Sequence, residues 1–255
     1  MSWNWEVFCK STLEDDFSPV CFGTGGEITY IDWLLSAWGW TLSVSALGLL
    51  VALVLGVVMG TLRTLPGDSF ISVLLKNLGN VWVELFRNIP VLVQVFLWYH
   101  VVPAIFPVMK GLPSFVLVSL ALGFFTSARI AEQVRAGIGA LPKGQRFAAM
   151  AMGLTTTQSY RYVILPMALR IVIPPLTSES MNIIKNSSVA FAVSVAELTL
   201  FAMQAQEETS RGIEIYLGVT LLYVISALTV NRIMSLVESR TRVPGFIATA
   251  SGGGH

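Results

Sequence analysis

Residues 36–62 read SAWGWTLSVSALGLLVALVLGVVMGTL, a stretch that contains no Asp, Glu, Lys or Arg. Spanning the hydrocarbon layer of a bilayer takes about 20 mostly apolar residues in a helix, because backbone amides cannot stay unpaired against acyl chains. This stretch is long enough to do so. The sequence therefore predicts a membrane-spanning helix over 36–62.

The composition of the whole chain extends this interpretation. Of the 255 residues, 54% are hydrophobic and 12% are charged, whereas roughly a quarter of the residues of a soluble domain are charged. Four more stretches have the length and apolar character of a span, namely 77–104, 114–138, 163–185 and 214–237. We expect an all-α membrane protein with five transmembrane helices. A soluble protein with five buried helices is the disfavoured alternative.

The distribution of charge predicts the orientation, because cytoplasmic loops retain Lys and Arg. One side of the predicted membrane domain collects most of the basic residues: Arg63, Lys76, Arg129, Arg135, Lys143, Arg146, Arg161, Arg170, Arg232, Arg240 and Arg242. The other side is richer in acidic residues: Glu6, Glu14, Asp15, Asp16, Glu27, Glu207 and Glu208. We expect the N-terminus outside the cytoplasm and the C-terminus inside.

This topology divides the chain into a periplasmic segment (1–30), a transmembrane domain (31–242) and a cytoplasmic tail (243–255). The first segment has no basic region before the first apolar run, so we do not expect a cleaved signal peptide. It holds both cysteines, Cys9 and Cys21. An oxidising compartment permits a disulfide between them, and two free thiols are also compatible. No residue pattern predicts a metal site.

Residues 142–166, PKGQRFAAMAMGLTTTQSYRYVILP, interrupt the apolar chain on the predicted cytoplasmic side. Pro142 suits the first turn of a helix that Gly153 can end in a left-handed conformation. Thr155 and Gln158 fit a capping box that begins a second helix, which Pro166 interrupts or merges into the fourth span. An ordinary connection between spans needs only a few residues. The pattern therefore favours a bent pair of helices that docks a partner.

Polar residues inside two of the spans are candidates for lining a transport path. Ionisable groups in a span are costly and face the bundle interior or an aqueous cavity. The second span carries Glu84, Arg87, Asn88 and Gln94 around the helix-loosening Pro90, and the fourth carries Glu179, Asn182, Lys185 and Asn186 after Pro174 and Pro175. A simple pairing of Glu84 with Arg87 competes with the first assignment. Polar contacts that only hold helices together compete with the second.

Lys185 is the residue in this set that best suits an anionic substrate, because a buried ammonium needs a counter-charge. Neutralisation by Glu179 or Glu197, snorkelling to the headgroups and a role unrelated to substrate charge are the alternatives.

Two further features concern packing. Gly48, Ala52, Gly56 and Gly60 form a ridge of small residues that permits close helix contact. The short apolar segment 187–203 fits either a periplasmic gate or a surface helix.

The stretch 142–166 resembles the signature loop of bacterial ABC importer permeases, E-A-A-x3-G-x9-I-x-L-P. The matching positions are Phe147, Ala148, Ala149, Gly153, Val163, Leu165 and Pro166, with Phe147 in place of the glutamate and Val163 in place of the isoleucine. The segments VELFRNIPVLVQVFLWY (83–99), ARIAEQVRAGIGALPKGQ (128–145) and PPLTSESMNIIKNSS (174–188) resemble the polar amino acid branch of that family, and most of all the permeases of glutamate/aspartate importers.

This resemblance implies a type I importer fold and a mechanical role in the bacterial inner membrane. A coupling helix (about 140–166) would then contact a cytoplasmic ATPase. Its members at the motif positions are Phe147, Ala148, Ala149, Gly153, Leu165 and Pro166. ATP and Mg²⁺ would bind that partner, and the sequence lacks a G-x-x-x-x-G-K-[ST] phosphate loop. The implied further partners are a periplasmic binding protein and a second permease subunit, either a related chain or a second copy. No feature indicates nucleic acid binding.

Functions of other classes are less well supported by the sequence. An intramembrane enzyme needs a nucleophile with its base, paired aspartates or metal ligands inside the spans. The aspartates Asp15, Asp16, Asp32 and Asp68 fall at or beyond span ends, and we find no catalytic set. A self-sufficient secondary transporter ordinarily has more spans and an internal repeat. Glutamine or histidine remains an alternative substrate within the importer interpretation.

Overall fold

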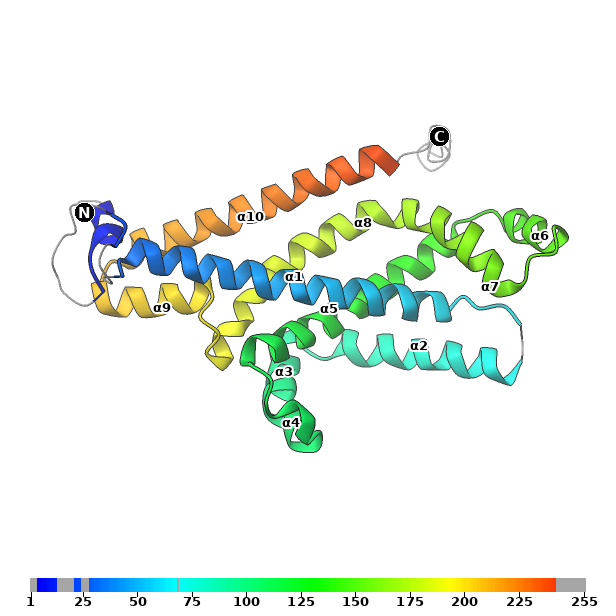
Figure 1. Cartoon of the computed structure of the whole chain (residues 1–255), viewed down its shortest axis with the longest axis horizontal. Coiled ribbons are helices and arrows are strands. Elements are labelled where there is room, and N and C mark those ends of the chain that lie inside the picture. Colours follow the sequence, from blue (N-terminus) through cyan, green and yellow to red (C-terminus); the bar gives the residue numbers. More distant parts are fainter. Residues whose placement is uncertain (1–3, 13–20, 24–27, 68, 242–255) are drawn as a thin grey trace, which may run out of the picture.

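A computed structural model describes residues 4–12, 21–23, 28–67 and 69–241 as an elongated bundle of helices (Figure 1). Its α-helices are α1 (Tyr30–Leu62), α2 (Phe70–Asn88), α3 (Val91–Phe96), α4 (Val102–Ile105), α5 (Ser114–Gly139), α6 (Lys143–Ala151), α7 (Thr156–Ser159), α8 (Leu165–Asn186), α9 (Leu198–Thr209) and α10 (Gly212–Thr241). Short 3-10 segments are η1 (Trp5–Cys9), η3 (Pro107–Met109) and η5 (Ser187–Val193), and π-helical segments are η2 (Leu97–Val101) and η4 (Tyr160–Ile164). The expected all-α architecture is confirmed. The predicted tail at 243–255 lies outside the described residues.

Four continuous helical runs are long and apolar enough to cross a membrane: Tyr30–Leu62, Ser114–Gly139, Thr156–Val193 and Gly212–Thr241. They contain four of the five predicted spans. The second predicted span, 77–104, is not one straight helix. It divides into Phe70–Asn88 and Val91–Ile105, which meet at an angle of 106° and make a fifth span only if the bent pair counts as one.

The bend at Pro90 has a local cause. Pro90 has no N–H to donate to the preceding turn, and Ile89 is extended with φ −90° and ψ 129°. The Gln94 side-chain nitrogen donates to the Phe86 carbonyl at 2.7 Å and to the Ile89 carbonyl at 3.1 Å. Gln94 is 2% exposed. Its amide therefore satisfies backbone acceptors that the broken helix would otherwise leave unpaired.

The small residues of α1 pack against α5, as the ridge in the sequence predicts. Gly48, Ala52, Gly56 and Gly60 are all buried. A Cβ added at Gly56 would lie 2.6 Å from the Cβ of Ile130, and one at Gly60 would lie 2.7 Å from the Ala131 carbonyl oxygen. Close approach of two backbones is the usual packing device of membrane helices. The α1–α5 pair forms the centre of the bundle.

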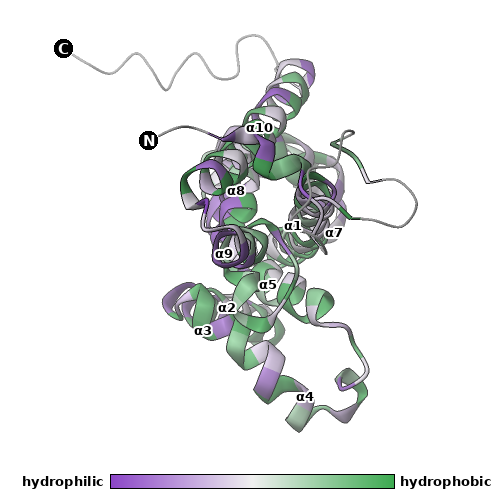
Figure 2. Cartoon of the chain, turned by 90° about the vertical axis from the view of Figure 1, so that its left-hand side faces the viewer, coloured by the Kyte–Doolittle hydropathy of each residue, from purple (hydrophilic) through white to green (hydrophobic). Residues whose placement is uncertain are grey.

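The outer surface of the bundle is apolar, in keeping with a lipid environment. Figure 2 looks along the bundle and shows green, hydrophobic residues on many of its helices, with α4 projecting from one side. Leu50 is 60% exposed, Val54 58% and Leu228 58%. Exposure of such large apolar side chains along whole helices is unfavourable in water and favourable in a bilayer.

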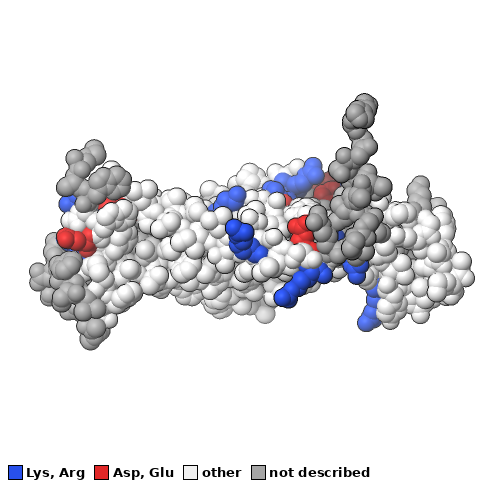
Figure 3. Space-filling view, turned by 90° about the horizontal axis from the view of Figure 1, so that it is seen from above, with Lys and Arg blue, Asp and Glu red and all other residues white. Residues whose placement is uncertain are grey.

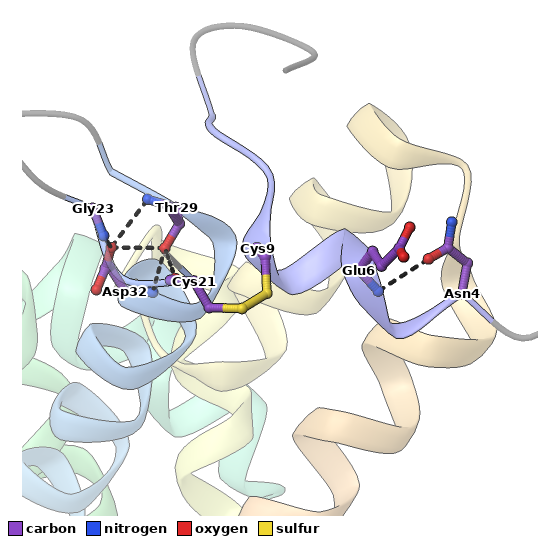
Figure 4. Close-up of a disulfide and its surroundings, with 7 residues drawn as sticks. All are labelled: Asn4, Glu6, Cys9, Cys21, Gly23, Thr29 and Asp32. Atoms are coloured by element: carbon purple, nitrogen blue, oxygen red, sulfur yellow. Dashed lines mark hydrogen bonds between the residues drawn. A yellow bond between two sulfur atoms is a disulfide. The ribbon is translucent and has the colours of Figure 1, made fainter. Parts of the chain in front are cut away.

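The N-terminal segment packs onto one end of the bundle (Figure 4). Cys9 and Cys21 form a disulfide, which resolves the two alternatives that the sequence left open. The carboxylate of Asp32, in the first turn of α1, accepts hydrogen bonds from Gly23 N at 2.8 Å and Thr29 N at 3.1 Å. Residues 13–20 and 24–27 of the predicted periplasmic segment lie outside the described part of the chain.

The same segment also contacts α10. Asn4 N donates to a Glu214 carboxylate oxygen at 3.0 Å. The ring of Phe8 lies so close to Gly218 that a Cβ there would be 2.8 Å from it. Val7 and Phe8 join a buried apolar cluster with α1, α9 and α10. The N-terminal segment therefore holds α1 against α9 and α10, which lie far from it in the sequence.

Candidate functional site

The helices α6 and α7 form a bent element at the end of the bundle opposite the N-terminal segment (Figure 1). We call residues 143–159 the α6–α7 element. Gly153 has φ +83°, the left-handed conformation that its position predicts. Its N–H donates to Met150 O at 2.9 Å, and the next N–H, from Leu154, donates to Ala149 O at 3.1 Å. This pair of bonds is a Schellman motif, which ends α6 at a defined angle.

The second helix of the element begins with the predicted capping box. Gln158 N donates to Thr155 Oγ1 at 3.3 Å, and Thr155 N donates to Gln158 Oε1 at 2.8 Å. One detail differs at the start of α6, where Pro142 is the N-cap and Lys143 is the first helical residue. The bend between α6 and α7 is thus fixed at both ends by local hydrogen bonds, so the element is not a flexible loop.

The α6–α7 element continues into the fourth span without a break. The helical run extends from Thr156 to Val193, with the π-helical segment η4 between α7 and α8. Pro166 lies in the first turn of α8 and does not interrupt it. The sequence left open whether Pro166 interrupts the second helix of this region or whether that helix merges into the fourth span. The two merge. A movement of α7 would therefore pass directly to α8.

The surface of the α6–α7 element is apolar where it faces away from the bundle. Phe147 is 67% exposed, Met150 50% and Met152 82%. Ala148 and Ala151 are exposed beside them, whereas Ala149 is 3% exposed and packs against the rest of the chain. Leu165 is half-buried and Pro166 is exposed. An exposed apolar tip on a rigid helical element is typical of a docking surface.

Polar contacts join the ends of α1, α2, α5 and η4 near this element. Arg63, directly after α1, forms an ion pair with Glu132 of α5 at 2.7 Å and donates to Asn80 of α2 at 2.8 Å. The Tyr160 hydroxyl donates to the Thr64 carbonyl oxygen. A cavity of about 240 Å³ lies beside this contact, between the ends of α1 and α5 and the α6–α7 element.

The predicted path residues of the second span do not share one helical face. Glu84, Arg87 and Asn88 are exposed on α2, before the bend. Gln94 lies after the bend and is buried against its own backbone. Within the part of the chain that the structure describes, no ion pair joins Glu84 to Arg87. Asn88 donates its side-chain amide to the Glu84 carbonyl at 2.8 Å.

The predicted path residues of the fourth span divide between burial and exposure. Glu179 is 4% exposed and packs toward α5, Asn182 and Asn186 are half-buried, and Lys185 is exposed. Among the described residues, Lys185 takes part in no ion pair. Glu179 is the partner of a different cation, because Arg129 Nε lies 2.9 Å from its Oε2.

Two polar residues near Glu179 were missed by the sequence analysis. Arg129 belongs to the middle of α5, inside the predicted span 114–138, and the sequence analysis had counted it only among the basic residues of one side. Gln133 donates its amide to Glu179 Oε1 at 3.1 Å. The available signal was the position of Arg129 inside the apolar run 114–138, with Gln133 one helical turn later.

The segment 187–203 is also more divided than expected. It comprises η5 and the first half of α9, separated by a turn at Ser194, which has φ +59°. Glu197 is completely buried and caps α9, accepting from Thr199 N at 2.9 Å, Leu200 N at 3.0 Å and the Tyr223 hydroxyl at 2.9 Å. In the described residues, no group of three His, Cys, Asp or Glu side chains could hold a metal ion.

The sequence of the chain is similar to those of several known permeases. The chain is 38% identical over 255 residues to the glutamate/aspartate import permease protein GltJ of Escherichia coli K12, covering 96% of this chain and 97% of that protein. It is 35% identical over 200 residues to the probable glutamine ABC transporter permease protein GlnM of Bacillus subtilis, covering 78% and 89%. It is 33% identical over 203 residues to the glutamine permease GlnP of E. coli K12, covering 80% and 90%.

Solved structures show the same fold. An amino acid ABC transporter crystallised with histidines matches with a TM-score of 0.70 and 29% identity, covering 83% of this chain and 95% of that one. An inward-facing form of the MetNI methionine transporter matches with a TM-score of 0.70 and 22% identity, which supports the fold alone. Residues 52–243 match the family described as binding-protein-dependent transport system inner membrane component. This chain belongs to that family of bacterial inner-membrane transport proteins.

Proposed function

We propose that this chain is the permease subunit of an ATP-driven importer of polar amino acids, with glutamate and aspartate as its substrates. The 38% identity to a glutamate/aspartate permease over almost the whole of both chains supports this substrate assignment. Relatives named as glutamine permeases make glutamine the first alternative. Histidine is a further alternative, from the solved transporter with histidines.

The observation that carries the proposed mechanism is the rigid α6–α7 element with its exposed apolar tip. Phe147, Met150 and Met152 would bury their side chains in a cytoplasmic ATPase, which binds and hydrolyses ATP with Mg²⁺. The Schellman motif at Gly153 and the capping box at Thr155 keep the element stiff. A stiff helix that continues into α8 transmits a displacement, whereas a flexible loop would absorb it.

A second permease subunit follows from the exposed ionisable side chains. Glu84 and Arg87 are exposed on α2, the first part of the bent second span. Contact of such groups with lipid costs a few kcal/mol each. They therefore face an aqueous path that this chain shares with a related permease or with a second copy of itself. Substrate would move along that path as the two subunits alternate between outward and inward states.

The charge distribution supports an orientation with the N-terminus in the periplasm and the C-terminus in the cytoplasm. In Figure 3, most of the visible Lys and Arg gather over the half of the molecule that ends in α6 and α7, and an uncharged stretch separates them from acidic residues at the other end. This polarity follows the positive-inside rule. The end with the Cys9–Cys21 disulfide would then receive a periplasmic binding protein.

Uptake by a reconstituted complex tests the function. The chain is purified with its partner ATPase, second permease and binding protein, and the complex is placed in proteoliposomes. We expect glutamate uptake that requires internal ATP and external binding protein and that aspartate inhibits better than glutamine or histidine. Uptake driven by an ion gradient alone would contradict the importer mechanism. ATP-driven uptake of glutamine alone would keep the mechanism and replace the substrate.

Thiol labelling of intact spheroplasts tests the orientation. After mild reduction, a membrane-impermeant maleimide should label Cys9 and Cys21. The matched control replaces both cysteines with serine and introduces Ser239→Cys near the end of α10, where labelling should require an opened membrane. The reverse pattern would invert the topology.

A further inference from the structure

Arg129 lies far from both ends of α5. At a rise of about 1.5 Å per residue, it is about 22 Å from Ser114 and about 15 Å from Gly139 along the helix axis. Both distances exceed the length of an arginine side chain, so the guanidinium does not extend past either end of α5. Its side chain is nevertheless 41% exposed. Arg129 thus places a permanent positive charge on the surface of a helix that is long and apolar enough to cross a membrane.

The ion pair with Glu179 leaves most of the guanidinium unused. The contact is made by Arg129 Nε, which lies 2.9 Å from Glu179 Oε2. A guanidinium has five N–H donors, and its two terminal nitrogens form a fork that matches a carboxylate. Those terminal nitrogens have no partner among the described residues of this chain. They can therefore bind a second carboxylate while Nε keeps the first, or replace the first with the second.

Glu179 is held in a way that permits such an exchange. Its Oε1 accepts a hydrogen bond from Gln133 at 3.1 Å, one helical turn from Arg129 on α5. This bond does not depend on Arg129. When Arg129 turns toward another carboxylate, Glu179 keeps a neutral donor, so its buried charge is not left without a hydrogen bond. An exchange of one carboxylate for another also keeps the arginine charge paired throughout.

Among the described residues, α5 forms a second ion pair with another part of the chain, between Arg63 and Glu132, which lacks these properties and serves as a comparison. Arg63 and Glu132 lie 2.7 Å apart near the end of the bundle, and the side chain of Arg63 is only 12% exposed. Arg63 also donates from Nε to Asn80 at 2.8 Å, and Glu132 has a second cation, Arg135, at 3.1 Å. Arg63 and Glu132 thus each have a further polar partner. This pair fastens helices together, whereas the Arg129 pair presents a half-exposed cation with free donors.

We infer that Arg129 is a specificity-determining residue, whose free guanidinium nitrogens bind the side-chain carboxylate of an acidic amino acid during its passage. Glu179, which Gln133 holds by a hydrogen bond, pairs with the guanidinium again when the substrate leaves. The inference rests on the proposed function and extends it, because it assigns charge selectivity to the permease itself as well as to the binding protein. A neutral amide has no equivalent charge to offer Arg129, so glutamine and asparagine would bind more weakly.

Substitution of Arg129 alone would leave Glu179 as an unpaired buried charge and could unfold the protein for that reason. The informative variant is therefore Arg129→Gln with Glu179→Gln, which removes both charges and keeps side chains that can hydrogen-bond. Its matched control is Arg63→Gln with Glu132→Gln, the same double change in the other ion pair of α5. Each variant is purified as the complete complex with the ATPase and the second permease, and its yield is compared with wild type.

Binding of radiolabelled glutamate and glutamine is then measured on the nucleotide-free complex without binding protein, so that binding-protein selectivity does not enter. We expect the Arg129/Glu179 double variant to lose glutamate affinity by roughly 10-fold or more, the factor that one charged hydrogen bond supplies, with glutamine affinity unchanged. The Arg63/Glu132 variant should keep the wild-type ratio of the two affinities. A wild-type ratio in the Arg129/Glu179 variant, or equal losses for both ligands, would overturn the inference and make the pair purely structural.

Proteoliposome uptake by the wild-type complex separates this inference from the proposed function. If wild type shows ATP-driven glutamate uptake and the double variant keeps the wild-type binding ratio, only the inference fails. If wild type shows no ATP-driven uptake of glutamate, the proposed substrate fails first and the inference fails with it.

Discussion

The hydroxyl group of Tyr160 donates a hydrogen bond to the main-chain carbonyl of Thr64. Tyr160 begins the π-helical segment η4 that follows the α6–α7 element, and Thr64 comes two residues after the end of α1. The bond therefore joins the base of the proposed coupling element to the helix at the centre of the bundle. Its two residues are 96 positions apart in the sequence, and no local pattern in either segment predicts that they meet.

Removal of this hydroxyl should weaken coupling more than folding. We expect Tyr160→Phe to cost about 0.5–1.5 kcal/mol of stability, the net value of one hydrogen bond. Uptake per ATP hydrolysed should fall in proteoliposomes, because η4 can then move without α1. Tyr162→Phe is the control, since Tyr162 is 63% exposed and has no hydrogen bond within the described chain. An unchanged ratio of uptake to hydrolysis in Tyr160→Phe would show that the contact carries no motion.

Gly153 and Gly144 form a matched pair for testing the bend of the α6–α7 element. A Cβ added at either glycine meets nothing within 4 Å, but only Gly153 has a positive φ, +83°. A side chain in the left-handed conformation costs about 1–2 kcal/mol. Gly153→Ala should therefore reduce both binding-protein-stimulated ATP hydrolysis and uptake, and Gly144→Ala should reduce neither.

Asparagine tolerates the left-handed conformation better than alanine does, so Gly153→Asn should recover part of the lost uptake. Complex yield is measured for all three variants, because the defect is expected in transport and not in membrane insertion. Normal uptake by Gly153→Ala at normal yield would contradict the assignment of this bend to coupling.

The hydrogen bonds of Gln94 at the Pro90 bend lead to a prediction about stability. Gln94→Leu keeps a side chain of similar size but leaves the Phe86 and Ile89 carbonyls without their donor. An unsatisfied buried group costs about 1–3 kcal/mol, so the melting temperature of the purified complex should fall by several degrees. Gln204→Leu on the exposed surface of α9 is the control and should leave the melting temperature unchanged. An equal effect of both substitutions would show that the bend does not depend on Gln94.

Local signals account for the parts of the fold that the sequence predicts correctly. The spans over α1, α5, α8 and α10 follow from apolar length, which the membrane enforces on every backbone segment. The turn at Gly153 and the cap at Thr155 follow from residues that bond within the same turn. The sequence predicted one span over 77–104 that Pro90 only loosens, and it did not predict a sharp bend after α2. Its 106° angle depends on a side chain in the next helix.

Contacts between helices account for what the sequence analysis missed. The sequence analysis named Glu179 as a candidate path residue of the fourth span, which does not identify its partner. That partner, Arg129, lies on α5, a different span, and the sequence analysis had counted it only among the basic residues of one side. The pairing of Cys9 with Cys21 similarly depends on how η1 packs on α1 and α10. The composition of the segment fits paired and free cysteines equally well.

Lys185 supplies the last prediction, because the structure removes two of the explanations for its charge. Glu179 is committed to Arg129 and Gln133, and Glu197 is committed to the first turn of α9 and to Tyr223. Neither acidic residue is therefore available to neutralise Lys185, which lies exposed in the last turn of α8. Snorkelling, substrate contact and a role unrelated to charge remain, and they predict different results.

If Lys185 attracts acidic substrates at the outer mouth of the path, Lys185→Gln should slow uptake of glutamate and aspartate more than uptake of glutamine. Lys185→Arg should keep most of the activity, because the positive charge is retained. The difference between wild type and Lys185→Gln should also shrink as salt rises, since exposed charges are screened over about 10 Å at 0.1 M ionic strength. The assay uses one saturated binding protein, loaded in turn with each ligand that it accepts. Equal loss of charged and neutral ligands would make Lys185 structural, and no loss at any salt concentration would favour simple snorkelling to the headgroups.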